Sequence, residues 1–192
     1  GYATIVQTFK DIYSWASVLI YRGQSTFGYL PFFTASSSSE LTSSGTGSET
    51  LQEGYLQLKV TSAQTDFLLT RHKTSVLANT GITVRGVVTV VNTNSGNAPT
   101  ICEIELEQSG GNYWKLKVVM QEGSFEVFDT SPLTPVSLLS QAFNCDNGFE
   151  FLMSISPAGK ACFYYRNKGY DSLKEFITGF KNTTLTTVAT GS

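Results

Sequence analysis

The sequence predicts an all-β protein built as an antiparallel β-sandwich, with at most one or two short helices. Short segments in which apolar and polar residues alternate follow one another along most of the chain, and turn-forming sequences separate them. Small hydroxyl residues are frequent, since 22 Ser and 24 Thr make up 46 of the 192 residues, whereas only 15% are charged. This composition is typical of extracellular or virion-surface β-proteins rather than of proteins with long helices.

The composition also excludes several classes of function. The net charge is −2, so no basic excess indicates binding to nucleic acid. No apolar run approaches the ~20 residues of a membrane-spanning helix. The aromatic content of 12% argues against a disordered tail. We expect one domain over residues 1–192, and the start at Gly1 favours a piece of a longer polypeptide.

The first fifty residues divide into two parts. Residues 1–35 are rich in aromatic side chains and are predicted to form strands, with a short helix as an alternative at Thr8–Trp15. Residues 34–50 consist mainly of Ser, Thr and Gly, with Leu41 as their one large apolar residue. This second part is predicted to be a long surface loop or a linker.

From residue 55 onward the pattern has the period of two that strands require. A one-turn helix is an alternative at Ser137–Phe143, and two final strands are expected at Glu175–Lys181 and Thr183–Val188. The other predicted strands are Tyr55–Thr61, Asp66–Thr70, Thr83–Asn92, Thr100–Glu107, Tyr113–Gln121, Ser124–Phe128, Phe149–Ser156 and Lys160–Arg166. Their lengths and the turn sequences between them are typical of an antiparallel sandwich.

The most informative segment is the predicted hairpin from Thr100 to Gln121. One face of it is apolar and must contact the core; its side chains are Cys102, Ile104, Leu106, Trp114, Leu116, Val118 and Met120. The opposite face holds Glu103, Glu105, Glu107, Tyr113, Lys115 and Lys117. If Glu107 pairs with Tyr113 across a five-residue loop, Glu105 lies opposite Lys115 and Glu103 opposite Lys117. Each such pair contributes roughly 0.2–1 kcal/mol.

This charged side of the hairpin has three interpretations. It is a solvated, salt-bridged surface, a face that contacts carbohydrate, or a set of catalytic carboxylates. Neighbouring carboxylates on one strand face lie about 7 Å apart, a separation that suits a glycosidase. The nearby ammonium groups favour ionised carboxylates, however, and a general acid must be protonated. If Thr83–Val91 forms the neighbouring strand, Arg85 and Thr89 extend this face.

A second candidate binding segment is Lys160–Tyr170, which combines aromatic residues with cations. If Phe163 faces the core, Tyr164 and Arg166 point outward, where an aromatic ring and a hydrogen-bond donor could hold a sugar. An ordinary sandwich strand has the same pattern. His72 is the single histidine and is interpreted as a surface residue, with a catalytic base beside Arg71 as the alternative.

The three cysteines, Cys102, Cys145 and Cys162, show no metal-binding spacing. Free, buried thiols are expected, and one disulfide that involves Cys145 stays open as an alternative. Asn182-Thr183-Thr184 is a single glycosylation sequon. Neither a metal nor a cofactor is expected.

From Gly54 onward, the order of motifs resembles that of the concanavalin-like jelly rolls, particularly the alginate-lyase-type polysaccharide lyases. Residues 54–58 are similar to the Gly-x-Leu-x-Leu strand of those proteins, and Arg71 to their arginine-bearing strand. Residues 115–117 are similar to the Lys-Leu strand that follows, and residues 176–181 stand where a Phe-x-x-Gly-x-Tyr strand is found. The resemblance implies a jelly-roll fold. Laminin-G-like modules and the heads of virus and phage fibres use related sandwiches.

The departures from the lyase pattern fall on its chemistry. Glu103 and Glu105 occupy the positions of the family's Gln and His, and Lys181 occupies the position of its Tyr. Two glutamates would repel an acidic polymer, so the fold can persist without the lyase activity.

We therefore expect a non-catalytic recognition domain that binds a glycan or a cell-surface receptor. It would be the exposed attachment head of a larger viral or secreted protein, and a homo-oligomer through that parent polypeptide. One alternative is a polysaccharide lyase that uses Arg71, His72 and Lys181. The other is a structural protrusion or oligomerisation domain. The candidate ligand-binding residues are Arg85, Glu103, Glu105, Tyr113, Lys115, Lys117, Tyr164 and Arg166.

Overall fold

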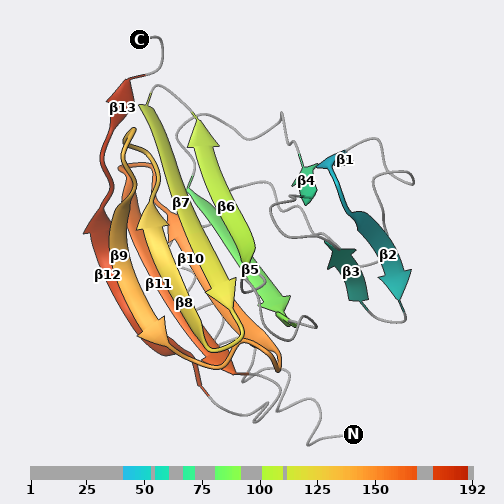
Figure 1. Cartoon of the computed structure of the whole chain (residues 1–192). Coiled ribbons are helices and arrows are strands. Elements are labelled where there is room, and N and C mark those ends of the chain that lie inside the picture. Colours follow the sequence, from blue (N-terminus) through green and yellow to red (C-terminus); the bar gives the residue numbers. More distant parts are fainter. Residues whose placement is uncertain are drawn as a thin grey trace, which may run out of the picture. The chain divides into compact units, whose positions relative to one another are not determined.

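The described part of the chain consists of β-strands and connecting segments, as predicted. The computed structural model describes residues 41–52, 55–60, 67–71, 81–91, 101–109, 112–167 and 175–189. These residues contain no helix, and their strands fall into two compact units, β1–β4 and β5–β13 (Figure 1). The strands are β1 (Leu41–Gly45), β2 (Ser48–Gln52), β3 (Tyr55–Lys59), β4 (Phe67–Arg71), β5 (Ile82–Val88), β6 (Cys102–Ser109), β7 (Asn112–Gln121), β8 (Ser124–Asp129), β9 (Val136–Ala142), β10 (Phe149–Ile155), β11 (Lys160–Asn167), β12 (Ile177–Thr184) and β13 (Val188–Ala189).

The smaller unit corrects the prediction that residues 34–50 form a loop or linker. Strand β1 pairs antiparallel with β4, and Leu41 lies opposite Arg71. Strand β2 pairs antiparallel with β3, and Ser48 lies opposite Lys59. Residues 44–48 are exposed, so backbone pairing rather than burial of an apolar face organises this stretch. For that reason the sequence lacks the alternating pattern that reveals a strand. Residues 34–40 and the elements predicted before them lie outside the described residues.

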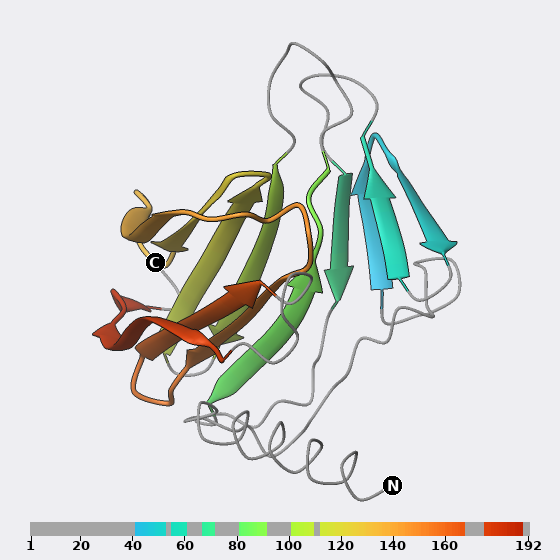
Figure 2. The ribbon, with the colours of Figure 1, turned by 90° about the horizontal axis from the view of Figure 1, so that it is seen from below.

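The larger unit contains two antiparallel sheets. One sheet has the strand order β12-β11-β10-β5. In the other sheet, β9 pairs with β8, and β8 pairs with β7. Strand β7 also pairs with β6 along most of its length and with the short β13 at Asn112 and Tyr113. Figure 2 shows these strands from a second direction. Within this unit the prediction of an antiparallel sandwich is confirmed.

The two sheets are joined by a core of aromatic and aliphatic side chains. Phe125 on β8 lies 5.7 Å from Phe163 on β11 and 4.9 Å from Phe149 on β10, measured between ring centroids. The predicted apolar face of the hairpin supplies much of the opposite wall: Leu116, Val118 and Met120 are fully buried. Each buried side chain of this size stabilises the fold by roughly 1.5–3 kcal/mol.

The hairpin of β6 and β7 has the predicted faces but a different register. Ser109 lies opposite Tyr113, so Glu107 lies opposite Lys115 and Glu105 opposite Lys117. Every pair is displaced by two residues from the prediction. A shift of two leaves each side chain on its original face, so burial does not distinguish the two registers. The observed register extends the backbone ladder closer to the turn.

Strand β9 corrects the alternative of a helical turn at Ser137–Phe143. Its pairing with β8 shifts by one residue between Val127 and Phe128. Leu138 and Leu139 both contact the core as a result of this irregularity. Two adjacent apolar residues therefore interrupt the period of two and imitate a helical pattern.

Candidate functional site

A cluster of charged side chains lies on the outer surface of the sheet that contains β6, β7 and β8. We call this surface the charged face. It consists of Glu103, Glu105, Glu107, Lys115, Lys117, Phe128 and Thr130. The side chains of Lys115 and Lys117 are 28% and 25% exposed, and those of the three glutamates are 36–51% exposed. The cluster is therefore half-open to solvent and fixed on rigid strands.

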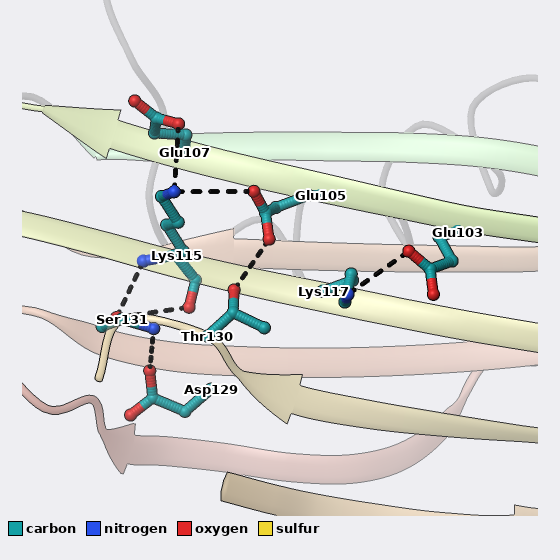
Figure 3. A network of polar contacts seen from close by, with 8 residues as sticks. All are labelled: Glu103, Glu105, Glu107, Lys115, Lys117, Asp129, Thr130 and Ser131. Atoms are coloured by element: carbon teal, nitrogen blue, oxygen red, sulfur yellow. Dashed lines mark hydrogen bonds and ion pairs between the residues drawn. The ribbon is translucent and has the colours of Figure 1, made fainter. Parts of the chain in front are cut away.

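Each ammonium group on the charged face lies beside at least one carboxylate (Figure 3). Lys115 Nζ is 3.9 Å from Glu105 Oε1 and 3.9 Å from Glu107 Oε2. Lys117 Nζ donates a hydrogen bond of 3.3 Å to Glu103 Oε2. The predicted pairs Glu103–Lys117 and Glu105–Lys115 thus exist, but they run diagonally across the ladder because of the register shift. Exposed pairs of this kind contribute little to stability.

The segment after β8 fastens one end of this face. Thr130 Oγ1 donates a hydrogen bond of 2.9 Å to Glu105 Oε2. Lys115 N donates to Ser131 Oγ at 2.8 Å, and Ser131 N donates to Asp129 Oδ1 at 2.9 Å (Figure 3). The second oxygen of the buried Asp129 accepts a hydrogen bond of 2.8 Å from Thr186 N, next to β13. These bonds hold the backbone that carries Lys115 and Thr130 in one arrangement.

The chemistry available on the charged face is that of a binding surface. The three carboxylates and two ammonium groups of the charged face carry −3 + 2 = −1, and Glu126 on β8 adds a fourth carboxylate to the same outer surface, where it accepts a hydrogen bond of 2.6 Å from Ser137 Oγ. Among the residues that the structure describes, no group of three or more His, Cys, Asp or Glu side chains is arranged to hold a metal ion. The alternating carboxylates, ammonium groups and the Thr130 hydroxyl offer hydrogen bonds, and Phe128 adds a half-buried aromatic ring on the same surface.

The structure brings together four of the eight predicted site residues and places three others elsewhere. Glu103, Glu105, Lys115 and Lys117 form the charged face. Tyr113 takes the register position opposite Ser109 and Val188 at one end of it, and its side chain lies outside the described part. Arg85, Tyr164 and Arg166, which were also predicted to face a ligand, lie on strands of the other sheet.

The prediction that Arg85 extends the charged face is wrong. Strand β5 pairs with β10 in the second sheet and not with β6. There Arg85 Nε donates a hydrogen bond of 2.6 Å to Glu150 Oε1, and Arg166 Nε donates one of 2.9 Å to Glu150 Oε2. Arg85 and Arg166 therefore hold one carboxylate between them, 65 and 16 residues away in the sequence.

Glu150 is fully buried, yet it remains the anionic centre of this cluster. Burial acts to raise the pKa of the Glu150 carboxyl, but the hydrogen bond from Arg166 and the charge of Arg85 outweigh it and hold the pKa below its ordinary value. The side chain of Arg85 is 31% exposed and that of Arg166 10%. The side chains of this cluster point away from the sandwich core, and the two ion pairs of Glu150 have a structural role.

Tyr164 and Arg166 lie on the predicted side of β11, but they are not exposed to solvent. Both point away from the sandwich core, but both are buried, with 4% and 8% exposure. Tyr164 packs with Leu152, Cys162 and Phe176. The guanidinium carbon of Arg166 lies 4.3 Å from the centroid of the Phe176 ring, within cation–π range. A sheet face that is covered cannot serve as an open ligand surface.

Sequence reasoning missed three residues that matter here. Phe128 lies on the charged face, in register with Lys117, and Thr130 binds Glu105. Glu150 joins the two arginines of the other sheet. The period of two in β8 and β10 places Phe128 and Glu150 on the outer surfaces, and this signal was available in the sequence. Nothing local indicated the partners of Thr130 and Glu150.

The three cysteines are free, in agreement with the expectation. Burial, and secondarily the charge of Glu103, raises the pKa of Cys102 to about 11. Burial, together with the nearby Asp146 and Cys102, raises the pKa of Cys145 to about 12. Thiols with such values stay protonated and unreactive.

The residues of the lyase alternative are only partly placed. Arg71 ends β4 in the smaller unit, Lys181 is an exposed residue of β12 in the larger unit, and His72 lies outside the described residues. Lys181 Nζ lies 6.0 Å from the centroid of the Tyr164 ring.

No family model, curated protein or solved structure matches this chain. The resemblance to concanavalin-like jelly rolls therefore stays a hypothesis. Within the described ranges, none of the elements is a helix with the length and apolar character that crossing a bilayer requires.

Proposed function

We propose that this chain is a non-catalytic recognition domain that binds a glycan on the charged face. The observation that carries the proposal is a half-open array of carboxylates on β6, ammonium groups on β7 and the Thr130 hydroxyl just after β8, together with the half-buried Phe128 ring on β8. Sugars are bound by polar groups in fixed positions together with an aromatic surface for their apolar patches.

Rigidity supports this assignment. Ser131 and Asp129 tie the backbone at Lys115 to the neighbouring segments, so the backbone that presents the polar groups is already ordered before a ligand arrives. A preorganised surface loses less conformational entropy on binding. The exposed attachment head of a viral or secreted parent protein is the setting that we propose for such a domain.

A glycan array tests the proposal, with the wild-type chain and two double variants run together. Lys115→Ala/Lys117→Ala removes two lysines from the charged face. Lys160→Ala/Lys181→Ala removes two lysines from the other sheet and serves as the matched control. All three proteins are first compared by thermal unfolding, so that loss of binding is not confused with loss of the fold.

We expect the wild-type chain and the Lys160/Lys181 control to bind the same glycans, and the Lys115/Lys117 variant to lose at least tenfold in affinity. Binding that survives equally in both variants would show that the charged face is not the site. An array on which the wild-type chain binds nothing would refute glycan recognition.

A further inference from the structure

The charged face offers more hydrogen-bond acceptors than donors. Its three carboxylates outnumber its two ammonium groups, and both ammonium groups lie within 4 Å of a carboxylate. Figure 3 shows one oxygen of Glu103 and one of Glu107 without a contact to the residues drawn. In the described part of the chain, Glu103 and Glu107 contact the lysines through Oε2, so Oε1 of each is available to accept from a ligand.

The two available acceptors are far apart. Glu103 and Glu107 are four residues apart on β6, which corresponds to about 13 Å along a strand. Both side chains are about half exposed, at 51% and 49%. The hydroxyl groups of a single sugar ring do not span this separation, so a ligand that reaches both carboxylates contains more than one ring.

The same carboxylates would repel an acidic ligand on the charged face. An anion placed beside Lys115 or Lys117 would also lie beside the carboxylates that already contact those ammonium groups. At about 4 Å in bulk water, each carboxylate repels an anion by roughly 1 kcal/mol and each ammonium group attracts it by the same amount. The one carboxylate in excess therefore leaves a net repulsion of about 1 kcal/mol, which corresponds to about fivefold in affinity. Charges arranged in this way exclude a ligand by repulsion.

From these observations we infer that the ligand class is a non-acidic oligosaccharide, whose hydroxyl or amino groups donate hydrogen bonds to Glu103 and Glu107. Phe128 on β8 lies in register with Lys117 and Glu105, midway between Glu103 and Glu107 along the strand direction, and supplies the aromatic surface. Charge-assisted hydrogen bonds of this kind are stronger than those between neutral groups. The inference rests on the proposed function and specifies the ligand of the same site.

The experiment compares matched glycans rather than single ligands. Galactose- and N-acetylglucosamine-terminated oligosaccharides are tested beside their sialylated and sulfated forms at fixed ionic strength. The variant Glu103→Gln/Glu107→Gln removes both acceptor charges and changes the charge of the face from −1 to +1. Asp146→Asn/Glu175→Gln makes the same change in total charge at two exposed positions outside the charged face.

We expect the wild-type chain and the Asp146/Glu175 control to bind neutral oligosaccharides at least fivefold more tightly than the acidic forms. The Glu103/Glu107 variant should lose at least tenfold in affinity for the neutral forms, and its discrimination against the acidic forms should disappear. Equal or tighter binding of the acidic forms by the wild-type chain would overturn this inference and leave glycan recognition standing. Binding of no glycan at all would overturn both.

Discussion

Replacing Gly159 with alanine is expected to destabilise the protein by about 2–5 kcal/mol. Gly159 lies in the turn between β10 and β11, and its φ of +75° is in the left-handed region. A residue with a Cβ atom occupies that region at a cost of roughly 1–2 kcal/mol. The new Cβ would also lie 2.5 Å from both Cε2 and Nε1 of the buried Trp114 indole. Displacing a packed side chain typically costs about 1–3 kcal/mol more.

The matched control is Gly123→Ala in the turn between β7 and β8. A Cβ atom there would meet no atom within 4 Å, and the φ of Gly123 is outside the left-handed region. This substitution should leave the free energy of unfolding within about 1 kcal/mol of the wild-type value, because it mainly restricts the unfolded chain.

The assay is equilibrium unfolding in urea, with the free energy of unfolding extrapolated linearly to water. A second measurement repeats Gly159→Ala in a Trp114→Leu background. The leucine side chain ends at Cδ and has no atoms in the positions of Cε2 and Nε1, so the cost of the alanine should fall by at least about 1 kcal/mol. The reasoning would be refuted if Gly159→Ala were no more destabilising than Gly123→Ala. An unchanged cost in the Trp114→Leu background would refute the steric part alone.

Three further predictions follow from the charged and buried groups. Glu150→Gln should destabilise the protein by about 3 kcal/mol, the low end of the range for breaking a buried ion pair, because the Arg85 side chain is partly exposed. The pKa of Glu150 is lowered in the folded state, so its contribution is present above the unfolded pKa and is lost as the pH falls through the folded one. Unfolding measured from pH 6 to pH 3 should therefore show a flatter acid limb in Glu150→Gln, and an identical limb would contradict the assignment. Lys117→Ala should cost no more than about 1 kcal/mol in urea unfolding, and the difference should shrink in high salt; a cost of several kcal/mol would be inconsistent with an exposed pair. Cys102 and Cys145 should resist alkylation by iodoacetamide at pH 8 and react once the chain is unfolded, as followed by mass spectrometry; rapid labelling of the native protein would argue against buried, protonated thiols.

In the hairpin of β6 and β7, the local sequence pattern predicted the two faces but not the register. Alternation placed Leu116 and Lys117 on opposite faces correctly, because one face must be buried. It did not determine the register, since a displacement of two residues moves no side chain to the other face. The ion pairs Glu105–Lys115 and Glu103–Lys117 were anticipated, although they connect diagonal residues, whereas Glu107, which lies directly opposite Lys115, forms an additional pair with it.

In other strands, the sequence did not show the alternation that identifies a strand. In β9, two adjacent leucines both reach the core because the pairing with β8 is irregular, so the period of two fails where the strand is most apolar. In β1 and β2, serine and threonine are exposed in residues 44–48, and no apolar stripe marks the strands. For β1 and β2, composition alone therefore indicated a loop, although the backbone of each strand pairs with a neighbouring strand.

The sequence by itself determined the all-β class, the core face of each main strand and the charged face of the hairpin, because these depend on side chains two residues apart. The tertiary structure alone decided that β5 joins β10, that Arg85 and Arg166 share Glu150, and that Tyr164 is covered. Those outcomes depend on which strands become neighbours, and Arg85 and Glu150 are 65 residues apart. A local alternation reports burial, whereas the choice of neighbouring strands depends on the packing of the whole core.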